Sequence, residues 1–125
     1  MALFGKSKPV ILVVDDSPTV LEMNASILKI HYRVVKASSG KEAIEKAMKI
    51  KPDLIVLDAM MPELDGWEVC KIIKENSSTR KTKVIMCTGA SKGKEVEKAF
   101  SMGADSYIIK PVVPNKLLEK IESLL

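Results

Sequence analysis

The sequence predicts an α/β protein with a doubly wound parallel sheet and helices on both of its faces. Short, uninterrupted apolar runs recur about five times along the 125 residues. Amphipathic segments of helical length separate these runs, and capping residues mark where the segments begin. The hydrophobic fraction of 46% suits one compact domain of this length. We therefore expect a single domain over residues 9–125, preceded by a short basic tail at residues 1–8 and followed by no output domain.

The five apolar runs are the predicted strands. The first, VILVV at Val10–Val14, is β-branched and uninterrupted, which is typical of a parallel strand covered on both faces. Shorter runs of the same kind occupy residues 33–37, 54–57, 84–87 and 107–109. Because helical segments lie between successive runs, the strands are expected to be parallel and joined by crossover connections.

The helical segments carry recognisable start and stop signals. A side-chain oxygen can cap the first exposed N–H groups of a helix, and proline is tolerated in the first turn. The predicted start signals are Ser17 with Pro18, Ser39 with Gly40, Asp65, and Ser91. Gly103 suits the carboxyl end of the fourth helix. The fifth helix is expected from about Pro114 onward, with one apolar face formed by Leu117, Leu118, Ile121 and Leu125.

Composition argues against several classes of protein. The net charge of +4 comes from 20 Lys and Arg against 16 Asp and Glu, and the basic residues are spread along the chain without an Arg cluster. This pattern favours a solvated surface over nucleic-acid binding. The apolar runs are too short for membrane insertion and the amino terminus lacks a signal peptide, so we expect a cytoplasmic protein. Cys70 and Cys87 form no CxxC pair and are expected to be buried, reduced thiols.

Polar residues fall at the carboxyl ends of four predicted strands. Asp15 and Asp16 follow the first strand, Asp58 the third, Thr88 the fourth and Lys110 the fifth. All carboxyl ends of a parallel sheet point to one edge, where ligands bind at the reversal of strand order. Taken singly, each residue has an ordinary explanation, such as a helix cap for Asp16. Their joint placement indicates one site.

Three carboxylates in one crevice need compensation. Two unit charges about 4 Å apart repel by about 1 kcal/mol in water and about 4 kcal/mol at an effective dielectric of 20. Protons or a cation must offset this cost. Oxygen ligands without a nearby His or Cys indicate a hard divalent ion such as Mg²⁺, which is commonly held by carboxylates, waters and a phosphate. Lys110 could then reach a phosphoryl oxygen, and the Thr88 hydroxyl could donate to another.

These residues belong to a set of motifs that resembles the CheY-like receiver domain of two-component response regulators. The matching motifs are Asp15-Asp16-Ser17, Asp58 with Met61-Pro62 and Asp65-Gly66, Thr88-Gly89-Ala90, Gly103-Ala104-Asp105 with Tyr107, and Lys110-Pro111. They occur in the family's order and spacing from Pro9 onward. The resemblance implies a flavodoxin-like (βα)5 fold with strand order 2-1-3-4-5.

The resemblance also implies a phospho-acceptor signalling protein and not an enzyme beyond its own phosphorylation and dephosphorylation. Asp58 would accept a phosphoryl group from a histidine kinase or a phosphotransfer protein. The implied metal ligands for Mg²⁺, with Mn²⁺ as a substitute, are Asp15, Asp16, Asp58 and the backbone carbonyl of Met60. The implied phosphoryl-binding residues are Thr88, Gly89 and Lys110, with Lys110-Pro111 as a cis peptide.

The signal would pass from Thr88 to Tyr107 as the switch pair. It would then reach a downstream protein through the fourth helix, the fifth strand and the fifth helix. The residues expected on this surface are Lys94, Phe100, Met102, Tyr107 and Lys116. We expect a monomer, with dimerisation on phosphorylation as the alternative. Met60 and Ala90, which flank the phosphoryl position, are apolar here and cannot orient a water, so we hypothesise slow self-dephosphorylation.

Other classes fit less well. A haloacid-dehalogenase-type phosphotransferase needs a DxD motif followed by Thr or Val, and position 17 here is Ser. The segment GASKGKE at residues 89–95 is one residue short of a nucleotide-binding loop and lacks its hydroxyl. An FMN phosphate would be repelled by Asp15 and Asp16 unless a metal intervened. A phosphorylation-independent binding module of the same fold remains the alternative.

Overall fold

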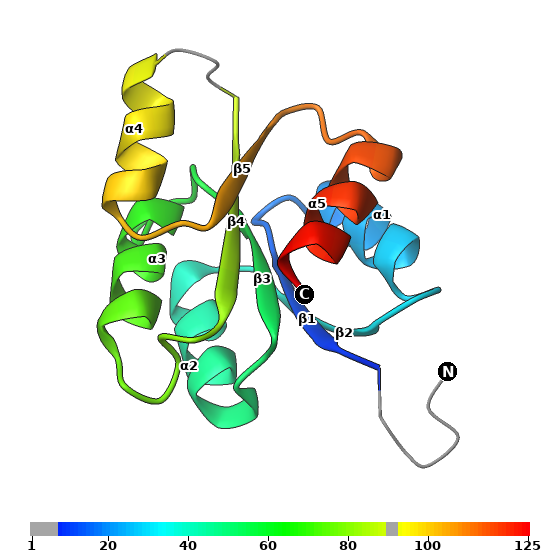
Figure 1. Ribbon diagram of the computed structural model, residues 1–125, viewed down its shortest axis with the longest axis horizontal. Helices are drawn as coiled ribbons and strands as arrows, with labels where there is room; N and C mark the ends of the chain where they lie inside the picture. The colour runs from blue at the N-terminus through cyan, green and yellow to red at the C-terminus, as the bar shows by residue number, and fades with distance from the viewer. Residues whose placement is uncertain (1–7, 90–92) are drawn as a thin grey trace.

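A computed structural model describes residues 8–89 and 93–125, with the side chains of α4 described from residue 97 onward. Strands and helices alternate along these residues (Figure 1). The strands are β1 (Val10–Val14), β2 (Arg33–Ala37), β3 (Leu54–Asp58), β4 (Lys83–Thr88) and β5 (Ser106–Ile109). The helices are α1 (Pro18–Leu28), α2 (Gly40–Ile50), α3 (Gly66–Glu75), α4 (Gly93–Ser101) and α5 (Pro114–Leu124).

The strands form one parallel sheet in the order β2-β1-β3-β4-β5. The predicted fold class and strand order are therefore confirmed. The chain moves from β1 to β2 on one side and then returns to the other side of β1 to form β3, so the strand order reverses between β1 and β3. At such a reversal the connections diverge and leave a crevice at the carboxyl edge of the sheet.

Helices cover both faces of the sheet, as Figure 1 shows: α1 and α5 lie on one face, and α2, α3 and α4 on the other. Alternate residues of β1 point to opposite faces, with Ile11 and Val13 in one core cluster and Leu12 and Val14 in the second. The first cluster is completed by buried residues such as Leu21, Leu28, Leu117 and Ile121. The second is completed by residues such as Ala43, Ala47, Val69 and Ile73. Burial on both faces explains why the central strands are apolar without interruption.

The helix starts follow the predicted caps where the structure describes them. The side chains of Ser17, Ser39 and Asp65 accept hydrogen bonds from backbone N–H groups of the first turns of α1, α2 and α3, at 3.4, 3.1 and 3.0 Å. Pro114 lies in the first turn of α5, which has no side-chain cap. The predicted cap Ser91 lies outside the described residues. Gly103, with φ of 95°, follows the end of α4 as expected.

Two strands run one residue further than the apolar pattern predicts. Asp58 and Thr88 are the last residues of β3 and β4, because they still pair in register with Cys87 and Ile109 on the neighbouring strands. Backbone pairing therefore fixes these two side chains more firmly than a loop would. Cys70 and Cys87 are buried free thiols, as predicted, and burial raises the pKa of Cys87 to about 12. Among the described helices, none has the length and apolar character needed to cross a membrane.

Candidate functional site

Three carboxylates meet at the carboxyl edge of the sheet. One carboxylate oxygen from each of Asp15, Asp16 and Asp58 lies within 4.8 Å of the others. Asp15 and Asp58 are only 3% and 2% exposed, whereas Asp16 faces solvent. The acids come together because β1 and β3 are neighbours in the sheet and end at the same edge.

Lys110 reaches into the same crevice from the end of β5. Its ammonium Nζ lies 2.7 Å from Oδ1 of Asp58, to which it donates a hydrogen bond, and 3.7 Å from Oδ2 of Asp15. The backbone N–H of Lys110 donates to the carbonyl of Thr88 at 2.8 Å, which fixes the chain beside the end of β4. The peptide bond between Lys110 and Pro111 is cis. One cation therefore partly compensates two buried carboxylates.

Backbone N–H groups orient the carboxylates. Ser17 donates to Oδ1 of Asp15 at 2.9 Å, and Met60 donates to Oδ1 of Asp58 at 3.3 Å. Each contact spans two residues, in the manner of an Asx turn, and holds the acid at the start of the loop that leaves its strand. The same Asp58 oxygen accepts from both Met60 and Lys110. Backbone groups and Lys110 therefore fix the orientation of these two carboxylates.

The electrostatic balance of the crevice favours cation binding. Burial raises the pKa of Asp58 above its ordinary value; the hydrogen bond from Lys110 opposes this shift, and the charge of Asp15 adds to it. Burial acts to lower the pKa of Lys110, but the hydrogen bond to Asp58 and the charges of Asp58 and Asp15 outweigh it, so the pKa is raised. Lys110 therefore stays charged, and an excess of negative charge remains.

The residues present fit a hard divalent cation. The donors are carboxylate oxygens, which Mg²⁺ prefers, and the described residues bring no His or Cys to the cluster. Met60 follows two residues after Asp58, and its side chain is 71% exposed, so the apolar side chain does not fill the crevice. Asp15, Asp16 and Asp58 could hold the ion. The resemblance to receiver domains implies the Met60 carbonyl as a further ligand.

The remaining predicted residues line the neighbouring strand ends. Thr88 is buried at 3% exposure at the end of β4, and Gly89 follows it at the surface. Tyr107 is half-buried on β5, where it pairs in register with Met86. Ala90 lies outside the described residues, and the side chain of Lys94 is not among those described. The structure thus places Asp15, Asp16, Asp58 and Lys110 in direct proximity. Thr88 ends β4, Gly89 follows it, and Tyr107 lies on β5 beside Met86, two residues before Thr88.

Gly66 is a supporting residue whose role the sequence did not reveal. The motif Asp65-Gly66 predicts only a turn and a helix cap. A Cβ atom on Gly66 would lie 2.1 Å from the carbonyl oxygen of Asp58, and the Gly66 N–H donates to the carbonyl of Ala59 at 2.9 Å. The first turn of α3 is therefore packed directly on the backbone that carries Asp58. The glycine after a capping Asp was the available signal, but the close approach is visible only in three dimensions.

Sequence comparison links this chain to one family and to several of its members. The response regulator receiver domain family matches residues 11–122. The chain is 39% identical over 112 residues to a probable cyclic di-GMP phosphodiesterase of Vibrio cholerae, covering 90% of this chain and 25% of that protein. It is 38% identical over 118 residues to the alkaline phosphatase synthesis transcriptional regulatory protein PhoP of Bacillus subtilis, covering 92% of this chain and 48% of PhoP. The chain thus spans about half or less of the length of these relatives.

Solved structures agree with the sequence matches. The Vibrio cholerae chemotaxis protein CheY4 superimposes with a TM-score of 0.90 at 30% identity, covering 95% of this chain and all of CheY4. The beryllofluoride-activated DrrB receiver domain superimposes with a TM-score of 0.86 at 32% identity, covering 94% of this chain and 97% of that domain. CheY-like receiver domains are signalling proteins of two-component systems and bind Mg²⁺ at an acidic pocket. From the family match, the CheY-like fold and the acidic crevice together, this chain belongs to the response regulator receiver domain family.

Proposed function

We propose that the chain is a phospho-acceptor that receives a phosphoryl group on Asp58 from the phosphohistidine of a histidine kinase or phosphotransfer protein. The observation that carries this proposal is the position of Asp58. It is buried beside two further carboxylates, and its oxygen lies 2.7 Å from a lysine ammonium. A carboxylate held in this way can act as a nucleophile towards phosphorus once its charge is screened. Residues 9–125 would form the receiver unit.

In the transfer step, an oxygen of the Asp58 carboxylate forms a bond to phosphorus as the bond between phosphorus and the histidine nitrogen breaks. The electron pair of the broken bond returns to the imidazole, and the product is an acyl phosphate. When bound, Mg²⁺ (or Mn²⁺) screens the repulsion between the carboxylates and the phosphoryl oxygens and stabilises the charge on those oxygens. Lys110 would pair with the new oxygens, and Thr88 and Gly89 would donate hydrogen bonds to them.

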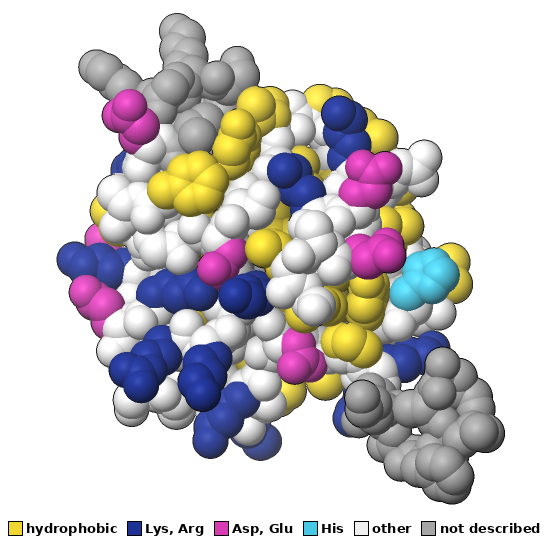
Figure 2. Space-filling view, viewed as in Figure 1, with side chains coloured by type: hydrophobic (Ala, Val, Ile, Leu, Met, Phe, Trp, Pro, Cys, Tyr) yellow, Lys and Arg dark blue, Asp and Glu magenta, His cyan; other side chains and the backbone are white. Residues whose placement is uncertain are grey.

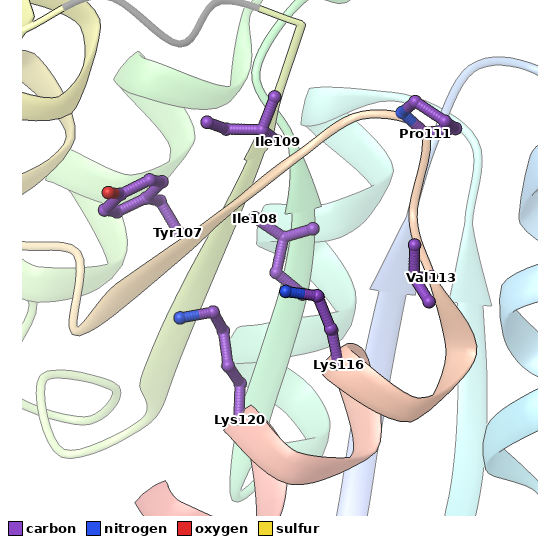
Figure 3. A pocket seen from close by; sticks show the side chains of 7 residues that line it. All are labelled: Tyr107, Ile108, Ile109, Pro111, Val113, Lys116 and Lys120. Carbon is purple, nitrogen blue, oxygen red and sulfur yellow. The ribbon is translucent and has the colours of Figure 1, made fainter.

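Signalling would follow from the added charge. Phosphorylation takes Asp58 from one negative charge to nearly two, which draws Thr88 and Lys110 toward the phosphoryl group. The inward movement of Thr88 would leave room for Tyr107, and the surface of α4, β5 and α5 would change. That surface includes a groove of about 360 Å³ lined by residues such as Tyr107, Val113 and Lys116 (Figure 3). A downstream protein would bind there, with the chain monomeric or dimerising on phosphorylation.

The test is the mass of the protein after incubation with acetyl phosphate and Mg²⁺. We expect one added phosphoryl group on the wild type and none on Asp58→Asn. Asp53→Asn is the matched control, because Asp53 lies at the opposite edge of the sheet, where it accepts from the backbone of Val10 at 2.8 Å. Removal of Mg²⁺ with a chelator should prevent the addition. A wild type that gains no mass would favour a phosphorylation-independent binding module of the same fold.

A further inference from the structure

The ring of Tyr107 is held from two sides by residues of different helices. Phe100 of α4 meets it edge-on, with 5.9 Å between ring centroids and an interplanar angle of 84°. Lys120 of α5 places its ammonium 5.7 Å from the centroid of the Tyr107 ring. Figure 3 shows the Lys120 side chain reaching from α5 toward Tyr107. Tyr107 is therefore in contact with both helices that border β5.

Neither contact is needed to complete the core. Phe100 is 49% exposed, and Lys120 and Tyr107 are both partly exposed. Figure 2 shows hydrophobic side chains reaching the surface in the region of α4 and β5, where this cluster lies. Exposed aromatic and cation–π contacts are weak individually, but they depend on the position of the ring. Such contacts can adjust an equilibrium between two ring positions without deciding whether the chain folds.

We propose that Phe100 and Lys120 are positioning residues that hold Tyr107 in its resting place and thereby set how readily phosphorylation switches the domain. This inference rests on the proposed function, in which Tyr107 moves toward Thr88. A ring that makes this movement loses its edge contact with Phe100 and leaves the Lys120 ammonium. Both contacts therefore stabilise the resting state alone, and their loss raises the population of the activated state.

The expected size follows from the strength of each contact. Removal of a partly exposed cation–π contact should shift the equilibrium about two- to fivefold. Removal of the aromatic pair should shift it about two- to twelvefold. A ligand that binds the activated state gains the same factor in apparent affinity, because a larger fraction of the protein is already competent to bind.

The experiment is a titration with beryllofluoride in saturating Mg²⁺, followed by the backbone amide NMR signals of Thr88 and Tyr107. We expect Lys120→Met to bind beryllofluoride about two- to fivefold more tightly than the wild type, and Phe100→Leu about two- to twelvefold. Lys120→Arg and Phe100→Tyr preserve the contacts and should retain wild-type affinity. The variants should be compared only after their unfolding midpoints have been measured.

Two further variants separate positioning from general effects. Lys81→Met removes the same charge from an exposed turn before β4; among the described residues, Lys120 is the cation recorded over the Tyr107 ring. Lys81→Met should therefore leave the affinity unchanged. In a Tyr107→Leu background, Lys120→Met should have no effect, because the ring on which it acts is gone.

The outcomes distinguish this inference from the proposed function. If the wild type binds beryllofluoride but Lys120→Met and Phe100→Leu bind it with unchanged affinity, the positioning role is refuted. Equal tightening by Lys81→Met and Lys120→Met would also refute it, because the effect would then be one of net charge. A wild type that does not bind beryllofluoride in Mg²⁺ would refute the proposed function itself, together with the switch that this inference requires.

Discussion

Gly66→Ala should destabilise the fold and displace the acceptor residue, although it adds a single methyl group. The added Cβ would lie 2.1 Å from the carbonyl oxygen of Asp58 and 2.9 Å from the Cα of Ala59. All of these atoms belong to the backbone, so no side chain can turn away to make room. Separation to an ordinary contact of about 3 Å or more requires a shift of about 1 Å between the start of α3 and the end of β3.

The cost of this shift has two parts. Overpacking a rigid interior site costs about 1–3 kcal/mol. The hydrogen bond from Gly66 to the carbonyl of Ala59, 2.9 Å long, would weaken or break at a further cost of about 1 kcal/mol. The sum is about 2–4 kcal/mol. With an unfolding entropy of about 2.1 cal/mol/K per residue, a chain of 125 residues should lose about 8–15 °C in melting temperature.

Thermal and urea unfolding, followed by the fluorescence of Trp67, measure this loss. Trp67 is the single tryptophan of the chain, is 4% exposed and directly follows Gly66. Gly89→Ala is the matched control, because a Cβ at Gly89 meets no described atom within 4 Å. It should melt within a few degrees of the wild type. If Gly66→Ala proves as stable as Gly89→Ala, the packing of α3 against the backbone of Asp58 and Ala59 does not constrain the site.

Three further predictions concern the site itself. Burial raises the pKa of Asp58, so the buried, ionised carboxylate lowers the free energy of unfolding at neutral pH. Asp58→Asn removes this charge and should therefore raise the free energy of unfolding at neutral pH. This gain should disappear as the pH falls below the ordinary carboxyl value, where the wild-type side chain is also neutral, and urea unfolding across pH would test it. Lys110→Met removes the cation that lies 2.7 Å from Asp58, so less positive charge opposes a bound metal ion. We expect calorimetric titration to show Mg²⁺ binding about tenfold tighter than in the wild type. Weaker binding would contradict the excess of negative charge in the crevice. Met60→Gln supplies an amide that can orient a water molecule. We therefore expect the phosphorylated variant to lose its phosphoryl group faster than the wild type, as followed by the mass of the protein. Loss from the wild type within seconds would contradict the hypothesis that an apolar Met60 prolongs the lifetime of the acyl phosphate.

The alternation of apolar runs and capped helices was sufficient to predict the fold. Val10–Val14 is covered on both faces as its composition indicates, and the caps at Ser17, Ser39 and Asp65 are made. The grouping of Asp15, Asp16, Asp58 and Lys110 was also predictable, because strand ends of a parallel sheet share one edge. The fold follows from the periodicity of apolar residues, and the grouping of the site follows from the rule that parallel strands end at one edge. Neither prediction depends on exact distances.

Details that depend on distance could not be predicted in this way. The pattern placed Asp58 and Thr88 after their strands, whereas backbone pairing makes them the last strand residues. Lys110 was expected to meet a phosphoryl oxygen, and its ammonium also donates a hydrogen bond to Asp58, which the sequence pattern did not predict. The contacts of Lys120 and Phe100 with Tyr107 join residues of three elements whose spacing no local pattern encodes.

The hydrogen bond from Lys110 to Asp58 joins residues 52 positions apart. This separation affects the order in which the parts of the site come together during folding. Pairing of β1 with β3 brings the acids together, but the lysine arrives only when β5 has joined β4. A partly synthesised or partly unfolded chain can therefore gather the carboxylates without the residue that would hold a phosphoryl group. Phosphorylation of Asp58 would then require a complete sheet. The fraction of molecules that can be phosphorylated would therefore also measure the fraction that is fully folded.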